Sequence, residues 1–121
     1  MERVQLPRLR RGTRPYKEAV ERTRALVHAR VAFYAKAYGI SYGAISIRKQ
    51  KTRWGSCSRA GNLSFNYRIG FLPPYLADYI IVHELCHIIE HNHSERFWAQ
   101  VARVFPNPHT LRKQLYSGYT F

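Results

Sequence analysis

The chain has 121 residues and carries 20 Lys and Arg against 7 Asp and Glu, a formal net charge of +13. This length allows one domain with a single core and excludes a chain of several domains. With 45% hydrophobic and 14% aromatic residues, the composition excludes a disordered tail. The charge favours contact with nucleic acid, anionic membrane surfaces or acidic partners, although a solvated basic surface would account for it equally well.

The first fourteen residues are strongly basic. Residues 1–14 contain five arginines and no long apolar face, so we expect a basic N-terminal arm followed by a single domain over residues 15–121. Pro15 suits the first position of a helix, and apolar side chains then recur at steps of three and four up to Gly39. This spacing predicts an amphipathic helix over residues 16–38.

Alternation of apolar and polar residues replaces the helical period after Ala44. It predicts two half-buried strands, at residues 45–48 and 63–67. Residues 52–62 between them are rich in Gly, Ser and Asn, which indicates a turn or a bulge. We therefore expect the two strands to pair with each other as an antiparallel ribbon.

Three further helices are expected in the C-terminal half. Two prolines open the first of them, over residues 73–90. Asn92 and Glu95 form a capping pair for the next helix, which ends before Pro106. A short helix then begins at residue 107 and leaves a tail at residues 117–121. The elements together predict an α+β domain with an N-terminal helix, a short antiparallel β-sheet and C-terminal helices.

The segment His83-Glu84-Leu85-Cys86-His87 has the pattern of a zinc site. Its two imidazoles lie at i and i+4 on one helix face, and Glu84 faces the same cleft. Zn²⁺ accepts neutral imidazole nitrogens together with water. We therefore predict that His83 and His87 bind one zinc ion, with two metal-free histidines as the alternative. Cys86 lies about 100° further round the helix and is expected as a packed thiol.

Four residues are candidates for the third zinc ligand: Glu90, His91, His93 and Glu95. If the helix persisted, His91 would lie about 12 Å along its axis from His83, so these two could not share an ion. His93 lies beyond the expected helix break at Asn92, so the chain can fold back towards the metal. We prefer His93 for this reason, and Glu90 and Glu95 remain rival oxygen ligands.

A zinc ion with three protein ligands keeps one position open for water, which distinguishes a catalytic site from a closed structural one. Glu84 is then the expected base that takes a proton from the zinc-bound water and passes it to the leaving amine. A structural zinc domain without turnover is a competing interpretation.

The chain contains several motifs, in the same order, that resemble those of the YgjP-like metallopeptidase family, whose members are relatives of the SprT-like zinc proteases. The similarity is strongest over residues 45–104. It rests on Thr52-Arg53-Trp54-Gly55-Ser56-Cys57, Leu63-Ser64-Phe65-Asn66-Tyr67, Asp78-Tyr79-Ile80-Ile81-Val82-His83-Glu84-Leu85-Cys86-His87 and Asn92-His93-Ser94-x-x-Phe97-Trp98.

The resemblance implies a small zincin-like α+β domain in which His83, His87 and His93 hold one zinc ion and Glu84 is catalytic. The expected activity is that of an endopeptidase acting on peptides or proteins. The resemblance also suggests that the strand at residues 63–67 borders the cleft, where an exposed edge could pair with an extended peptide. Recruitment to DNA with little peptidase turnover, as the SprT-like relatives suggest, is the alternative function.

Two further expectations complete the sequence-based account. Arg53 could stabilise an oxyanion or pair with a carboxylate, and packing of Trp54 is the simpler reason for its motif. Apolar runs are far below the roughly 18 residues of a membrane-spanning helix, and no signal-peptide core is evident. We expect a cytoplasmic protein with reduced cysteines, Cys57 and Cys86, and without a membrane partner.

Overall fold

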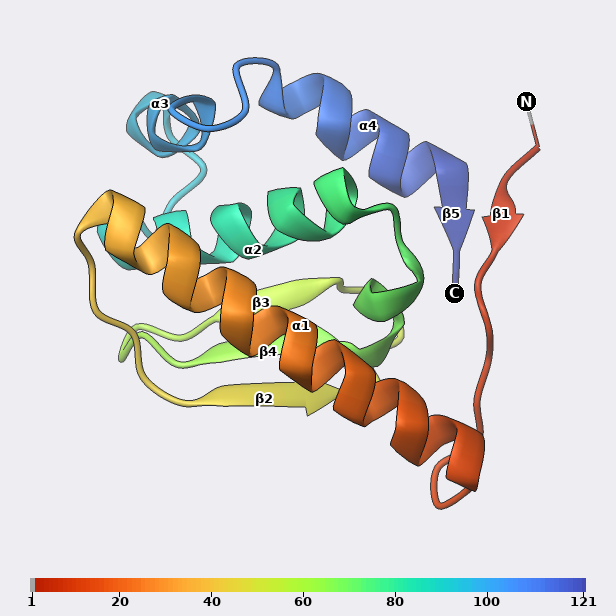
Figure 1. The fold of residues 1–121 in the computed structure, drawn as a ribbon. Helices are drawn as coiled ribbons and strands as arrows, with labels where there is room; N and C mark the ends of the chain where they lie inside the picture. The colour runs from red at the N-terminus through yellow and green to blue at the C-terminus, as the bar shows by residue number, and fades with distance from the viewer. Residues whose placement is uncertain (1) are drawn as a thin grey trace.

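Helices cover one face of a small mixed sheet in the computed structural model, which describes residues 2–121 (Figure 1). The α-helices are α1 (Arg14–Tyr38), α2 (Pro74–Ile89), α3 (Glu95–Ala102) and α4 (Pro108–Gly118), and a 3-10 helix, η1 (Tyr67–Phe71), precedes α2. The strands are β1 (Val4–Gln5), β2 (Ile45–Arg48), β3 (Gly55–Cys57), β4 (Leu63–Asn66) and β5 (Tyr119–Thr120). The predicted α+β class is confirmed.

Helix α1 begins two residues before its predicted start and ends where predicted. The hydroxyl of Thr13 caps it by accepting a hydrogen bond from the amide of Tyr16, and Gly39 ends it with a left-handed φ of 67°. Val27 and Val31, one turn apart, are fully buried. This face packs against α2, β2 and η1.

The pairing of the sheet differs from the prediction. The strand order is β2-β4-β3, with β2 parallel to β4 and only β3 antiparallel to it. The predicted antiparallel ribbon of β2 with β4 is therefore wrong. A tight turn is the cause: Ser58 bonds to Asn62 through its amide and Gly61 adopts a φ of 85°, so β3 forms the hairpin with β4. That hairpin leaves β2 to join the other edge of β4.

Helix α2 crosses the sheet and carries much of the core. Its side chains at Ile81, Leu85 and Cys86 are fully buried, and the helix contacts α1, β3, α3 and α4. The buried thiol of Cys86 agrees with its predicted packing role. The helix ends at Ile89, after which Glu90 has extended backbone angles of φ −135° and ψ 111°. The helix therefore ends one residue before its predicted end at residue 90, and the chain turns two residues before the break expected at Asn92.

The two ends of the chain lie side by side. Strand β5 pairs in parallel with β1, so residues 117–121 are not a free tail. Leu6 is 3% exposed, and the side chain of Arg8 donates to the backbone carbonyl of Phe121. Part of the expected N-terminal arm therefore lies against the C-terminal strand, and this pairing fixes the end of α4. Among residues 2–121, no helix is long and apolar enough to cross a membrane.

Candidate metal centre

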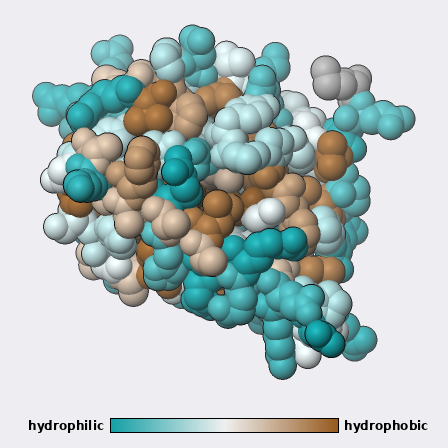
Figure 2. All heavy atoms as spheres, in the orientation of Figure 1, coloured by the Kyte–Doolittle hydropathy of each residue, from teal (hydrophilic) through white to brown (hydrophobic). Residues whose placement is uncertain are grey.

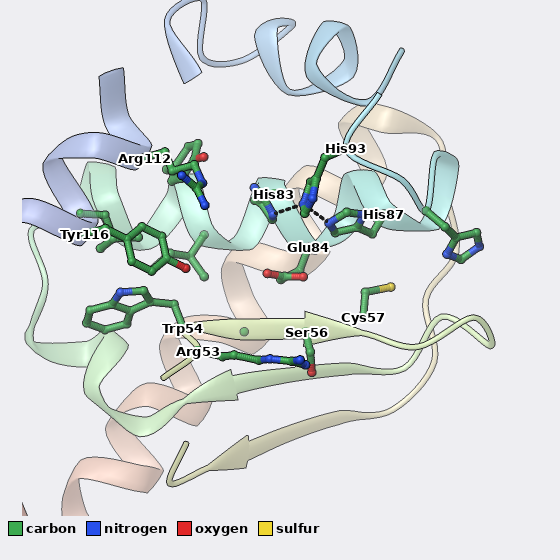
Figure 3. A pocket seen from close by; sticks show the side chains of 15 residues that line it. Arg53, Trp54, Ser56, Cys57, His83, Glu84, His87, His93, Arg112 and Tyr116 are labelled. Carbon is green, nitrogen blue, oxygen red and sulfur yellow. Dashed lines mark hydrogen bonds between the residues drawn. The ribbon is translucent and has the colours of Figure 1, made fainter. Parts of the chain in front are cut away.

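Three imidazoles converge at one point beside α2 (Figure 3). His83 and His87 come from consecutive turns of α2, and His93 comes from the loop before α3. The Nε2 atom of His93 lies 3.0 Å from Nε2 of His87 and 3.2 Å from Nε2 of His83. Within residues 2–121, these three form the cluster of metal-ligating side chains that could hold one ion.

The donor set fits a zinc ion. Zn–N bonds of about 2.0–2.1 Å in a tetrahedral site separate neighbouring nitrogens by about 3.3 Å, close to the 3.0 and 3.2 Å between these rings. The Nδ1 atom of His87 lies 3.2 Å from the carbonyl oxygen of Glu90. If this nitrogen donates its proton there, the Nε2 lone pair is free to face the cluster. The Nδ1 atom of His83 is buried without a hydrogen-bond partner.

The loop after α2 decides which side chains enter the cluster. It runs from Glu90 to Ser94, and the hydroxyl of Ser94 caps α3 by accepting from the amide of Phe97. The predicted cap at Asn92 is therefore wrong, because the chain turns back earlier and restarts its helix later. This course directs His93 towards α2.

The rival third ligands lie outside the cluster. The carboxylate of Glu90 is 4.0 Å from the guanidinium of Arg96, and its carbonyl faces His87 instead. Glu95 is exposed in the first turn of α3. His91 lines the neighbouring cavity without joining the three rings.

Aromatic side chains of α3 support the three rings. Phe97 stacks on His87 with ring centroids 4.3 Å apart, and Trp98 stacks on His93 at 5.8 Å. Burial, followed by the neighbouring His87 and His93, lowers the pKa of His83 to about 3 in the metal-free protein. The imidazole is consequently neutral at physiological pH, as metal ligation requires.

Glu84 lies beside the cluster in a largely dry position. Its side chain is buried, with the residue 7% exposed, and it contacts β3 at Gly55. A Cβ atom added to Gly55 would lie 3.0 Å from Cγ of Glu84 and 3.3 Å from its Oε2. Desolvation raises the pKa of Glu84 to about 8, and the charge of Arg53 opposes this rise. The carboxyl group can therefore exchange a proton near neutral pH.

A cavity of about 410 Å³ opens over the cluster and Glu84. One wall is β3 with the residues just before it, another is α2, and a third is α4. Strand β4 is the central strand, so the prediction that it offers a free edge to the cleft is wrong. The edge strand beside the cavity is β3.

Among the cavity residues that were not predicted from the sequence are Gly55, Arg112 and Tyr116. Gly55 permits the close approach of Glu84. Its position inside the motif at residues 52–57 was the one feature of the sequence that could have indicated its role. Arg112 and Tyr116 reach the cavity from α4, with the guanidinium 5.1 Å from the ring centroid of Tyr116 (Figure 3). Their spacing of four residues gave no indication of which elements α4 would contact.

The motif before β3 combines packing with cavity lining. Trp54 is 3% exposed and meets the ring of Phe121 edge-on at 4.7 Å, which agrees with its predicted packing role. Arg53 lines the cavity, and no carboxylate within residues 2–121 lies within 4.0 Å of it. The expected pairing of Arg53 with a carboxylate is therefore not observed.

The fold is that of a zincin-like metallopeptidase. Its helix α2 carries two histidines one turn apart, a third histidine follows the helix, and a sheet edge lies alongside. The chain belongs to the YgjP-like metallopeptidase domain family, whose pattern matches residues 10–117. This assignment confirms the family resemblance seen in the sequence.

Two solved structures share the fold. The metallopeptidase zymogen of Pyrococcus abyssi abylysin is 22% identical with a TM-score of 0.67, and the match covers 78% of this chain and 99% of that one. The metallopeptidase zymogen of Methanocaldococcus jannaschii jannalysin is 22% identical with a TM-score of 0.65, covering 75% and 94% respectively. A search of curated proteins gives no significant match.

Proposed function

We propose that the protein is a zinc-dependent endopeptidase in which His83, His87 and His93 hold the metal and Glu84 is the general base. The observation that carries this proposal is the convergence of three imidazoles beside the buried carboxyl group of Glu84. The Nε2 atom of His93 lies 3.0 Å from Nε2 of His87 and 3.2 Å from Nε2 of His83. Membership in a metallopeptidase family supports the same reaction class.

Glu84 supplies the proton transfers of the reaction. When bound, Zn²⁺ polarises the substrate carbonyl and makes water more acidic. The carboxylate of Glu84 accepts a proton as water attacks the peptide carbon, and it then donates that proton to the leaving nitrogen. A pKa raised towards neutrality suits a group that must act first as a base and then as an acid.

Strand β3 offers a way to hold the substrate. Within residues 2–121 it pairs only with β4, so its other edge is available beside the cavity. An extended peptide could add to this edge through main-chain hydrogen bonds, which would align its carbonyl with the cluster.

The ligand assignment is tested by comparing two neighbouring histidines. His93→Ala is expected to lower zinc affinity by an order of magnitude or more, because two imidazoles bind zinc far more weakly than three. His91→Ala is the matched control and is expected to retain zinc, since His91 is outside the cluster. Zinc content after dialysis against a graded chelator, measured by mass spectrometry, distinguishes the two. Equal zinc retention in both variants would contradict the assignment.

The activity is tested with a peptide library. The zinc-loaded protein is expected to cleave internal peptide bonds, to lose cleavage with a chelator and to regain it with added zinc. Complete inactivity of a stoichiometrically zinc-loaded protein towards unfolded and folded protein substrates would contradict the peptidase proposal.

A second candidate function rests on the start of α1. Arg10, Arg11, Arg14 and Lys17 are exposed there, and Figure 2 shows hydrophilic side chains gathered over this end of the helix, at the lower right. Such a surface could recruit the peptidase to nucleic acid. The measurement is DNA affinity across salt concentrations, because phosphate contacts release counterions and give a steep salt dependence. Weak binding that is insensitive to salt would contradict it.

A further inference from the structure

Helix α4 brings a positive charge to the wall of the cavity over the three histidines. Arg112 lines this cavity together with Tyr116, one turn later on the same helix (Figure 3). His83, His87 and His93 line the same cavity, so the guanidinium of Arg112 and the metal-binding cluster share one space.

Arg112 has no carboxylate partner within 4.0 Å among residues 2–121. The ion pairs in that part of the chain use other arginines: Arg14 with Glu18, Arg24 with Glu21, Arg30 with Asp78 and Arg96 with Glu90. The guanidinium instead lies over the ring of Tyr116, at 5.1 Å. Its planar array of donors is therefore free to meet a ligand in the cavity.

Positive charges gather around the cavity over the cluster. Like charges repel most strongly where water is partly excluded, and here a divalent cation and a guanidinium would face the same cavity. Arg53, on the β3 side, adds a second positive charge and also lacks a carboxylate partner. Glu84 is the single carboxyl group among the lining residues, and it is buried against Gly55. The cavity is thus electrostatically complementary to a negatively charged ligand.

We propose that Arg112 binds a carboxylate of the peptide substrate close to the bond that is cleaved, so that the peptidase prefers acidic substrates. This inference rests on the proposed peptidase function. A guanidinium binds a carboxylate through two parallel hydrogen bonds, and the ring of Tyr116 beneath it limits its orientation. For an endopeptidase this carboxylate belongs to an Asp or Glu side chain near the scissile bond. A free C-terminus offers the same chemistry, and its recognition there would make the activity that of a carboxypeptidase.

The first measurement compares matched peptides with the zinc-loaded protein. One series places Glu, Gln or Lys on either side of a defined scissile bond, and a second series has a free or an amidated C-terminus. The expected result is a kcat/KM at least about tenfold higher for Glu than for Gln at one of these positions, or for the free acid than for the amide. A preference for Glu over Gln would show that Arg112 binds a side-chain carboxylate. A preference for the free acid over the amide would show that it binds the C-terminal carboxylate.

The second measurement identifies the residue responsible. Arg112→Gln is expected to reduce the preference for the carboxylate peptide over its neutral partner by about tenfold or more, and Arg112→Glu to favour the Lys peptide. Lys113→Gln removes the same charge from the next position of α4, outside the cavity lining, and is expected to keep the wild-type preference. Zinc content and circular dichroism verify that each variant is folded and loaded.

The outcomes separate the inference from the proposed function. Cleavage without any preference for a carboxylate would overturn the inference and leave the peptidase intact. An equal fall in kcat for all peptides in Arg112→Gln would also overturn it, since that pattern belongs to stabilisation of the oxyanion. If no peptide is cleaved by the zinc-loaded protein, both proposals fail together.

Discussion

Replacing Gly55 with alanine should disturb Glu84 while leaving the histidine cluster in place. The added Cβ atom would lie 3.0 Å from Cγ of Glu84 and 3.0 Å from the backbone oxygen of Ser64. Comfortable contacts between carbon atoms are about 3.5–4.0 Å, so the carboxyl side chain or strand β3 must shift by about half an ångström. Overpacking of this kind destabilises a protein by about 1–3 kcal/mol.

The effect on catalysis should exceed the effect on folding. A misplacement of about 1 Å in a catalytic group can lower the rate by about a hundredfold, so half that shift in Glu84 should lower kcat/KM by about tenfold. Zinc content should remain at the wild-type level, because the atoms nearest to the added Cβ belong to Glu84 and Ser64 and not to His83, His87 or His93. The assays are peptide cleavage by the zinc-loaded variant, zinc stoichiometry and a thermal melt.

Gly70→Ala provides the matched control for the loss of stability. Its Cβ atom would meet the hydroxyl of Thr23 at 2.7 Å, outside the residues that line the cavity. This variant should lose stability with kcat/KM close to wild type once it is folded and loaded with zinc. The reasoning fails if Gly55→Ala retains wild-type cleavage, or if Gly70→Ala loses as much activity as Gly55→Ala.

Three further predictions concern buried or partly buried groups. Thr23→Val should destabilise the protein by about 1–3 kcal/mol in denaturant melts, because its buried hydroxyl donates to the carbonyl of Tyr67 at 2.6 Å and accepts from the amide of Gly70; unchanged stability would contradict this. In the metal-free protein the pKa of Glu84 is raised from 4.5 to about 8, so its ionisation opposes folding increasingly as pH rises between these values. With chelator present, Glu84→Gln should therefore be more thermally stable than wild type, and by a larger margin at pH 8 than at pH 5. A stability difference that is the same at both pH values would refute this prediction. Burial raises the pKa of Cys57 to about 11, so at pH 8 iodoacetamide should label this thiol about a hundredfold more slowly than an unfolded control peptide; equal rates, followed by mass spectrometry, would refute that.

Local patterns predicted the helices and the residues of the cluster. The 3.6-residue period and the flanking Pro and Gly residues define α1 without knowledge of its partners, and the histidine spacing in α2 depends only on helix geometry. The return of His93 could be anticipated because a break in the helix was expected. The position of that break was wrong by two residues, since Glu90 is extended and Ser94, not Asn92, caps α3.

Pairing between distant segments could not be read from the same patterns. Alternation identified β2 and β4 as strands, but alternation does not specify a partner or a direction. The three-residue strand β3 is too short to show a period, and it occupies the antiparallel position that β2 was expected to take. The contribution of α4 to the cavity depends on packing between elements, so Arg112 carried no signal in the sequence.

The most direct test of the central claim is the rate of peptide cleavage by zinc-loaded Glu84→Gln, with zinc content measured on the same sample. The matched control is Glu95→Gln, which changes an exposed carboxylate in the first turn of α3. Glutamine cannot accept the proton of the attacking water, so Glu84→Gln should bind zinc fully and cleave at least about a hundredfold more slowly than wild type. Cleavage by Glu84→Gln at the rate of wild type and of Glu95→Gln would contradict the account.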